Sequence, residues 1–454
     1  MTAELRPSLV AADDGSAAVG IDGQVASVLD RMAGARARPE WVVCVRGGSK
    51  ALRRVRESLF VVSDGMTGTR GSLEEDGPDT SPGLFVAGVF ERDPESGQSL
   101  VVLPSWATLG LHESLPPGTR MLDLRSGVLW REVAIGGKTR LRTARWSCLG
   151  RPGTSVLVAA GDSGVLNQGR AHEVLDAPST LGGGVRGVID TICLDGAGGT
   201  TGTTHVVRTA SYASGTRRLP GEDGLAARHR RALSVGPEVL FEEQLAAWGA
   251  RWKTCDIEVV GDPELTLAAR FALFHLAGSV ADHGEAAVGA RGLSGPSYAG
   301  HVFWDSDVFV LPVLAATHPP SARAMLEYRI RRLPAAASAA AALGRRGARF
   351  PWESAHDGSD VTPRAGVDER GELVPIRTGD LEEHITADVA WAAWQAAAWT
   401  GRWTTLEGRC RGLVVDTARY WASRIRTDAE GHGHIDEVIG PDEYHEGVDD
   451  NAFT

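Results

Sequence analysis

Lysine is almost absent from this chain, and arginine carries nearly all of its positive charge. The 454 residues contain 47 Lys and Arg against 58 Asp and Glu, for a formal net charge of −11. The only lysines are Lys50, Lys138 and Lys253. An acidic chain without a basic stretch is a poor match for a nucleic-acid backbone or an anionic membrane surface, so the sequence predicts neither partner.

Cysteines and long apolar runs are also scarce. The five cysteines are widely scattered, and no pair has the spacing of a metal or redox motif. No apolar run reaches the roughly 18 residues that a membrane helix needs. The N-terminus lacks the basic region and apolar core of a secretory signal. We therefore expect a cytoplasmic protein without a metal site.

The first part of the chain has a β pattern. Residues 1–39 are rich in Ala, Gly and Asp; the pattern of Ile21–Met32 is compatible with one short helix, and we expect much of this segment to form a flexible N-terminal extension. Between residues 40 and 235, short β-branched runs such as Leu84–Phe90 and Ser155–Val158 are bounded by Gly, Pro or Asp. Many short strands with turn signals between them predict an N-terminal antiparallel β-sandwich domain.

The apolar period becomes helical near Pro237. Residues 236–261 are predicted to form a linker helix followed by a short strand over Ile257–Val260. Asp262 and Pro263 have the character of a helix N-cap and first helical residue. From there helices alternate with long loops. The later predicted helices span 321–333, 335–343, 385–399 and 406–426.

Several tryptophans fall on the predicted helices near the C-terminal end. Trp391 and Trp394 are three residues apart and share a helix face. We expect packing between helices to be their role. The same expectation covers Trp399, Trp403 and Trp421.

Three loop segments, 300–307, 350–355 and 439–446, pair aromatic residues with carboxylates. Sugars need this combination, because an aromatic face packs on the C–H face of the ring and carboxylates accept hydrogen bonds from adjacent hydroxyls. The alternative is that Trp304 and Trp352 are core residues and the neighbouring acids are helix caps. Three such segments in one helical region favour a sugar site.

The last of these segments concentrates titratable groups. A Gly-Pro turn precedes Asp442, Glu443, His445 and Glu446. Crowding and burial of carboxylates raise their pKa, which is how a carboxylic acid stays protonated at neutral pH and serves as a general acid.

These segments resemble glycoside hydrolase family 65, which includes maltose, trehalose, kojibiose and nigerose phosphorylases and acid trehalase-type hydrolases. The resemblance begins at about Glu57 and continues to Thr454. It implies an N-terminal β-sandwich, a helical linker, an (α/α)6 barrel and a small C-terminal sheet, with residues 262–454 as the first part of the barrel. The motifs that carry it are Arg291–Leu293, Gly300–Asp305, Phe350–Ala355, Glu383–Ile385, Asp388–Ala390 and Ile439–Glu446.

The resemblance implies inverting cleavage of an α-glucosidic disaccharide, with Glu443 as the general acid. Trp304 and Asp305 match residues that hold the non-reducing glucose. The remaining substrate-binding candidates are Arg291, Trp352, Glu353 and His445.

The resemblance leaves two reactions open. In a phosphorylase, inorganic phosphate is the co-substrate and β-glucose 1-phosphate is released; in a hydrolase, a second carboxylate activates water. No cofactor is implied, and the partner is a small-molecule α-glucoside. Family members are often dimeric, so a homodimer is also implied, although no interface is identifiable.

The chain departs from the family at its end. It stops before the family's phosphate-binding residues or catalytic base, and it has fewer helices than the family's barrel. We therefore expect a C-terminally truncated chain with an incomplete barrel and little or no activity alone. An inactive sugar-binding fragment is the third interpretation.

Overall fold

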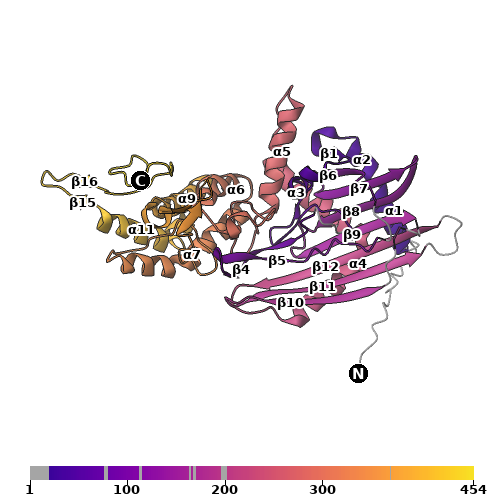
Figure 1. Cartoon of the computed structure of the whole chain (residues 1–454), viewed down its shortest axis with the longest axis horizontal. Helices are drawn as coiled ribbons and strands as arrows, with labels where there is room; N and C mark the ends of the chain where they lie inside the picture. Colours follow the sequence, from indigo (N-terminus) through magenta and orange to yellow (C-terminus); the bar gives the residue numbers. More distant parts are fainter. Residues whose placement is uncertain are drawn as a thin grey trace.

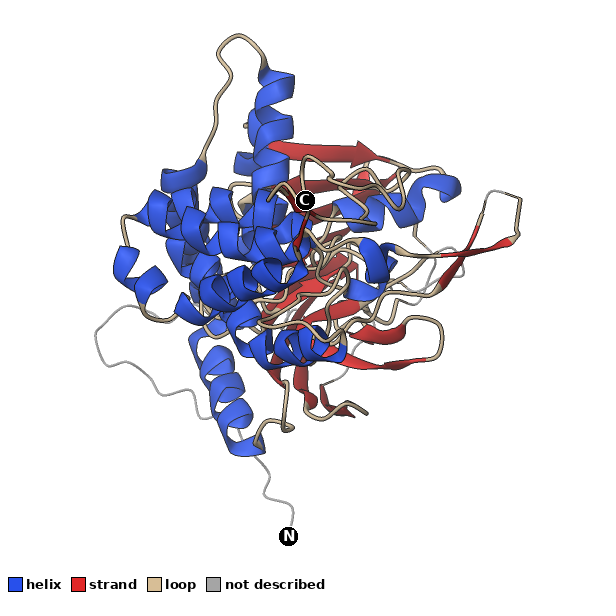
Figure 2. Cartoon of the chain, turned by 90° about the vertical axis from the view of Figure 1, so that its left-hand side faces the viewer, coloured by secondary structure: helices blue, strands red, loops and turns tan. Residues whose placement is uncertain are grey.

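The computed structural model describes residues 20–75, 80–111, 115–162, 165–166, 170–195, 202–368 and 370–454. Two lobes lie side by side, a β-rich lobe from the first half of the chain and a helical lobe from the second half (Figure 1). The turned view shows the helices in front of the strands (Figure 2).

An eight-stranded antiparallel sheet with the order β1-β6-β7-β8-β9-β12-β11-β10 forms the β-rich lobe. The inner strands β9 and β12 are buried along most of their length, because both faces of the sheet are covered. The strands are β1 (Val42–Arg46), β6 (Thr119–Asp123), β7 (Val128–Ile135), β8 (Lys138–Ser147), β9 (Thr154–Asp162), β10 (Ala171–Pro178), β11 (Gly184–Asp195) and β12 (Thr203–Gly215).

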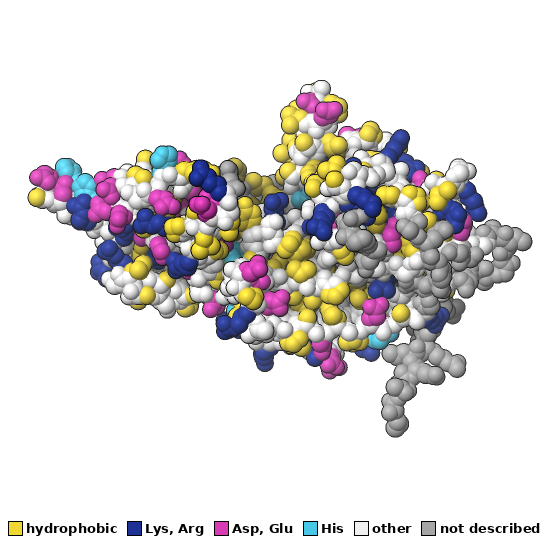
Figure 3. Space-filling model, in the orientation of Figure 1, with side chains coloured by type: hydrophobic (Ala, Val, Ile, Leu, Met, Phe, Trp, Pro, Cys, Tyr) yellow, Lys and Arg dark blue, Asp and Glu magenta, His cyan; other side chains and the backbone are white. Residues whose placement is uncertain are grey.

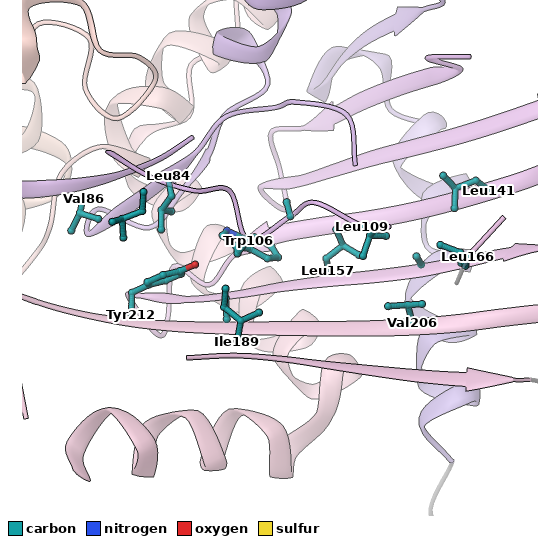
Figure 4. Packing of buried hydrophobic residues seen from close by; sticks show 14 of the residues in the cluster. Leu84, Val86, Trp106, Leu109, Leu141, Leu157, Leu166, Ile189, Val206 and Tyr212 are labelled. Atoms are coloured by element: carbon teal, nitrogen blue, oxygen red, sulfur yellow. The ribbon is translucent and has the colours of Figure 1, made fainter. Parts of the chain in front are cut away.

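A second, four-stranded sheet packs on one face of the first. Its strands are β2 (Val62–Ser63), β3 (Thr67–Thr69), β4 (Leu84–Asp93) and β5 (Gly97–Leu103). Leu84 and Val86 of β4 face Leu157, Ile189 and Tyr212 of the larger sheet across a dry core (Figure 4). The structure therefore confirms the predicted antiparallel β architecture of the N-terminal part.

Helices cover the other face of the large sheet: α1 (Ile21–Asp30), α2 (Met32–Arg36) and α4 (Glu222–Cys255). Val25, Val28 and Leu29 of α1 are almost completely buried in this layer. The short helix considered over Ile21–Met32 is present as α1. The prediction of a flexible extension is wrong for residues 21–36, since a single apolar face anchors the helix on the sheet. Residues 1–19 lie outside the described part of the chain.

The connection between the lobes differs from the predicted helix and strand. Helix α4 starts earlier and is kinked at Gly236, whose φ of 78° is left-handed, and Pro237 begins its second half. The predicted strand at Ile257–Val260 is absent from this described stretch, because no neighbouring strand is available to pair with it. Asp262 caps α5 (Pro263–Gly278) as predicted, accepting a hydrogen bond of 2.9 Å from the Leu265 amide.

The helical lobe is built on α6 (Leu311–Thr317), α7 (Pro319–Ala342), α9 (Ile385–Thr400), α10 (Trp403–Glu407) and α11 (Arg411–Arg424). Helix α7 is continuous through Pro334, where two helices were predicted. The shorter elements are α3 (Arg53–Leu59), α8 (Thr378–Leu381), β13 (Ala365–Val367), β14 (Leu373–Pro375), β15 (Arg426–Thr427), β16 (Gly433–His434) and the single turns η1 (Pro39–Trp41), η2 (Lys50–Leu52), η3 (Ser297–Gly300) and η4 (Ser306–Val310).

The tryptophans of α9 and α10 are not core residues. Trp391, Trp394, Trp399 and Trp403 retain 39, 48, 59 and 45% of their surface. The face of α9 that packs inward consists mainly of small residues such as alanine, which leaves the larger rings outside. The prediction of buried packing is therefore wrong for these four residues.

Acidic and basic side chains are interspersed over the face shown in Figure 3. Within the described ranges, no helix is both long enough and apolar enough to cross a bilayer.

Candidate active site

Two of the three aromatic-carboxylate segments lie directly side by side. The amide of Val302 donates to the carbonyl of Ser354 at 2.8 Å, and the Ser354 amide donates back at 3.1 Å. The rings of Phe303 and Trp352 meet edge to face with their centroids 5.6 Å apart. This short bridge fixes the relative positions of two nearby side chains. Trp304 lies two residues after Val302, and Glu353 lies one residue before Ser354.

His301 links Glu353 to the β-rich lobe. Its Nδ1 lies 2.6 Å from Oε2 of Glu353, and its Nε2 lies 2.7 Å from the carbonyl oxygen of Gln98 on β5. The side chain of Gln98 also accepts a hydrogen bond of 3.1 Å from the His356 amide. The four-stranded sheet therefore supports the wall of the site in the helical lobe.

The third segment reaches the same region. The amide of Ile439 donates to the carbonyl of Leu381 at 3.0 Å. The ring of Phe453 lies 6.0 Å from Trp304 and 5.1 Å from His384 between centroids. Arg424 adds a tie from α11, because its guanidinium contacts Glu383 at 2.8 Å.

Glu443 and Asp442 are adjacent in sequence but shifted in opposite directions. Loss of solvation raises the pKa of the Glu443 carboxyl, and the charges of Asp305 and Glu353 raise it further. The pKa of Asp442 is lowered, because its carboxylate accepts hydrogen bonds from the Tyr444 amide and from His445. Both residues are exposed, and the pKa values of their carboxyls are shifted in opposite directions.

Behind Trp304 lies a buried row of ionisable groups, Glu382, His384 and Asp388. His384 contacts Oε1 of Glu382 through Nε2 at 3.0 Å and Oδ2 of Asp388 through Nδ1 at 2.6 Å. Burial raises the pKa of Glu382 to about 7, with Glu443 and Asp305 adding to the effect. Burial alone would lower the pKa of His384, but its two carboxylate partners raise it to about 9.

Asp305 keeps more than a third of its surface exposed. Partial loss of solvation still raises the pKa of its carboxyl, against the lowering effects of a backbone hydrogen bond and of His384. The nearby Asp307 is buried and forms an ion pair of 2.5 Å with Arg329 of α7. Arg329 also donates to the carbonyl of Phe303 at 3.3 Å, which holds the backbone just before Trp304.

The structure brings together Trp304, Asp305, Trp352, Glu353 and Glu443. It does not bring Arg291 and His445 into direct contact with them. Arg291 is exposed, and no hydrogen bond or ion pair of its guanidinium was found within the described ranges. His445 is also exposed, and its Nδ1 lies 2.6 Å from Asp442.

The sequence analysis assigned no role to His301, Glu382, His384 or Asp388. His384 and Asp388 have the four-residue spacing that places two side chains on one helix face, which was a usable signal. Glu382 and His301 had no such signal, because their partners come from other parts of the chain.

Two hollows lined by described residues lie elsewhere. One, of about 270 Å³ including open solvent, is lined by residues of α4, α5 and α6, and the other, of about 400 Å³, by residues of α7, α9 and α10. Neither includes a residue of the three segments. The chemistry therefore points to the open, carboxylate-lined surface around Trp304.

Two family models match separate parts of the chain. The glycosyl hydrolase family 65 N-terminal domain matches residues 46–157, and the glycosyl hydrolase family 65 central catalytic domain matches residues 270–454. Together the two matches cover well over half of the chain.

Individual relatives agree with these matches. The chain is 32% identical to a kojibiose phosphorylase of Caldanaerobacter subterraneus over 91% of its own length and 64% of the relative. It is 38% identical to a kojibiose hydrolase of Flavobacterium johnsoniae over 49% of its length and 31% of the relative. A provisionally assigned kojibiose phosphorylase structure from the human microbiome has a TM-score of 0.77 at 16% identity, covering 91% of this chain and 62% of that one. The chain thus spans less than two thirds of these relatives.

Proposed function

The chain belongs to glycosyl hydrolase family 65, and we propose that it acts in the inverting cleavage of an α-glucosidic disaccharide with Glu443 as general acid. The observation that carries the proposal is the place of Glu443 within the match to the family's catalytic domain, in a setting where loss of solvation and the charges of Asp305 and Glu353 raise the pKa of its carboxyl. A carboxyl whose pKa is raised holds its proton to a higher pH and, while protonated, can pass it to the glycosidic oxygen as the C–O bond breaks.

The other residues of the site bind the sugar in this proposal. The ring of Trp304 offers an apolar face for the C–H groups of glucose, and Asp305 accepts hydrogen bonds from its hydroxyls. Trp352 and Glu353 line the adjacent wall. Arg291 and His445 stay candidates for substrate binding. The developing positive charge on the sugar ring is then stabilised by the surrounding carboxylates.

Phosphate is the proposed attacking group. Its oxygen forms a bond to the anomeric carbon from the face opposite the leaving sugar, while the proton of Glu443 moves to the leaving oxygen. The products are β-glucose 1-phosphate and the free acceptor sugar, and no cofactor is required. The phosphorylases among the relatives favour kojibiose as the first substrate to test.

Hydrolysis is the second candidate, favoured by the kojibiose hydrolases among the relatives. In that reaction water replaces phosphate, and glucose is released regardless of the phosphate concentration. The general acid and the sugar-binding residues keep the same roles. Only the attacking group and the residue that activates it differ.

We also propose the domain boundaries of the wider protein. Residues 40–235 form the β-sandwich, 236–261 the linker, and 262–454 part of an (α/α)6 barrel. The helices α6, α7, α9 and α11 pack around one apolar core, as neighbouring barrel helices do. A cytoplasmic homodimer stays a prediction.

Incubation of the 454-residue chain with kojibiose and other α-linked glucose disaccharides, with and without phosphate, tests the proposal. Glucose 1-phosphate that requires phosphate supports phosphorolysis, and glucose that does not require it supports hydrolysis. Glu443→Gln should lower kcat/KM by about 100-fold or more. The matched control is Glu446→Gln, an exposed carboxylate three residues further on. Absence of product from every sugar would contradict activity of this chain and leave the inactive-fragment interpretation.

A further inference from the structure

Three aromatic rings contact the imidazole of His384. Its ring centroid is 5.0 Å from Trp304, 5.1 Å from Phe453 and 6.4 Å from Trp352, and all three contacts are edge to face. Trp304 and Phe453 lie within the distance of about 6 Å at which the electron-rich face of an aromatic ring attracts a cation, and Trp352 lies just outside it. The protonation state of His384 therefore matters for the position of Trp304.

Both ring nitrogens of His384 face carboxylates. Glu382 and Asp388 occupy the two sides, and only a doubly protonated imidazole can donate to both. Glu382 and His384 are almost completely inaccessible to solvent. The contacts thus favour an imidazolium that is held rigidly in a place where water cannot screen it.

The outer groups of this row connect to the same loop. The charges of Asp307 and Arg329 act on the pKa of Asp388, and the charge of His384 acts on that of Asp305 in the loop that carries Trp304. The charge of Glu443 in the C-terminal segment raises the pKa of Glu382. One oxygen of Glu382, Oε2, is buried without a partner among the described residues. The charged groups around His384 thus come from the loop that carries Trp304 and Asp305, from the C-terminal segment, and from helices α7 and α9.

We propose that His384 is a positioning residue: its imidazolium, clamped between Glu382 and Asp388, holds the ring of Trp304 in the orientation on which glucose packs. The inference rests on the proposed function, because it assigns a purpose to the binding of sugar at Trp304. His384 itself touches neither the reacting atoms nor the proton of Glu443. Its effect on the reaction is indirect and passes through the Trp304 ring.

A double-mutant cycle tests whether His384 affects sugar binding through the ring of Trp304. His384→Gln keeps a polar side chain but removes the cation, and Trp304→Leu removes the ring on which the cation acts. Kd for glucose and kojibiose is measured by calorimetry, which needs no turnover. We expect His384→Gln to weaken binding about tenfold in the wild-type background and less than about twofold in the Trp304→Leu background. His432→Gln is the matched control, since His432 also contacts a carboxylate, Asp428, but is exposed and distant from the rings.

A second readout separates a positioning role from a folding role. Histidine-selective ¹⁵N NMR follows the protonation of His384 without any sugar, and Asp388→Asn should shift its titration to lower pH. In the wild type, sugar affinity should fall as pH rises through the His384 titration, and this fall should be missing in His384→Gln.

The outcomes are distinguishable. Additive losses in the cycle, or unchanged affinity in His384→Gln, overturn the inference while leaving the proposed function in place. A wild-type chain that neither binds nor cleaves any sugar overturns the proposed function and the inference together. In that case the NMR titration still shows whether the clamp on His384 exists.

Discussion

At the scale of single residues, the surroundings of Glu443 set its chemistry. Removing a negative neighbour should make its proton easier to lose. In Asp305→Asn, the loss of activity with rising pH should therefore begin at a lower pH than in the wild type, because a general acid works only while protonated. The pH profile of kcat/KM measures this shift.

The control for this change is Asp416→Asn, which removes a carboxylate on α11 that pairs with Arg419. Its profile should match the wild type. An unmoved profile in Asp305→Asn would show that Glu443 is not the group whose ionisation limits the reaction, or that Asp305 does not influence it.

Sequence reasoning identified Glu443 but not the cause of its raised pKa. The motif suggested crowding by its neighbours in sequence, whereas Asp442 is instead held ionised by local hydrogen bonds. The raising charges, Asp305 and Glu353, come from segments far away along the chain. Such coupling depends on tertiary structure and leaves no local pattern. For the same reason Glu382 was missed, since its buried position follows from the packing of α8 and the C-terminal segment.

At the scale of elements, the kink in α4 makes a matched pair of glycine substitutions informative. Gly236 has a left-handed φ of 78°, and an added Cβ would lie 2.4 Å from Oε1 of Gln24. Gly236→Ala should therefore destabilise the fold by about 1–3 kcal/mol. Gly249, in the same helix, has open space around it, so Gly249→Ala should stabilise by about 0.5–1 kcal/mol. Thermal unfolding of both variants measures the contrast. Equal shifts in Tm would contradict the requirement for a left-handed glycine at the kink.

A buried polar contact ties the first half of α4 to the large sheet. His229 bridges Asp190 of β11 at 2.7 Å and Ser211 of β12 at 3.0 Å, and His172 of β10 also reaches Asp190 at 3.0 Å. Although partial burial opposes the change, hydrogen bonds from both histidines lower the pKa of Asp190. Its ionised form is therefore favoured by folding.

The sign of the pH effect follows from that lowered pKa. The stabilisation is fully present above the ordinary aspartate value of about 4 and disappears as pH falls through the lower value of the folded state. Asp190→Asn should cost about 1–2 kcal/mol at pH 7, and the gap to the wild type should close below about pH 4. Asp176→Asn, which removes a more exposed ion pair with Arg186, is the control. A gap that widens in acid would contradict this account.

At the scale of the whole molecule, the order of β lobe, linker and helical lobe was predictable because the apolar period changes once, near Pro237. The boundaries were not. A short helix over Ile21–Met32 was recognisable in the sequence, but its burial was not, because it depends on a sheet formed much later in the chain. The contact between the lobes, from Nε2 of His301 to the carbonyl oxygen of Gln98, was also not predictable from the sequence, because a backbone carbonyl leaves no residue-specific pattern.

The tryptophans of α9 and α10 provide the last prediction. Four large rings, each more than a third exposed, lie on one helix pair, where Trp394 and Trp403 approach to 6.4 Å between centroids. Clustered exposed apolar surface favours association, so the 454-residue chain should show concentration-dependent self-association in light scattering. Trp394→Ser with Trp399→Ser should reduce it. Leu373→Ser, which changes an exposed apolar residue on β14, should leave it unchanged.

A monodisperse chain at all concentrations would mean that this surface does not drive association. Equal reductions in both variants would show that the effect is one of total apolar surface and not of the aromatic cluster.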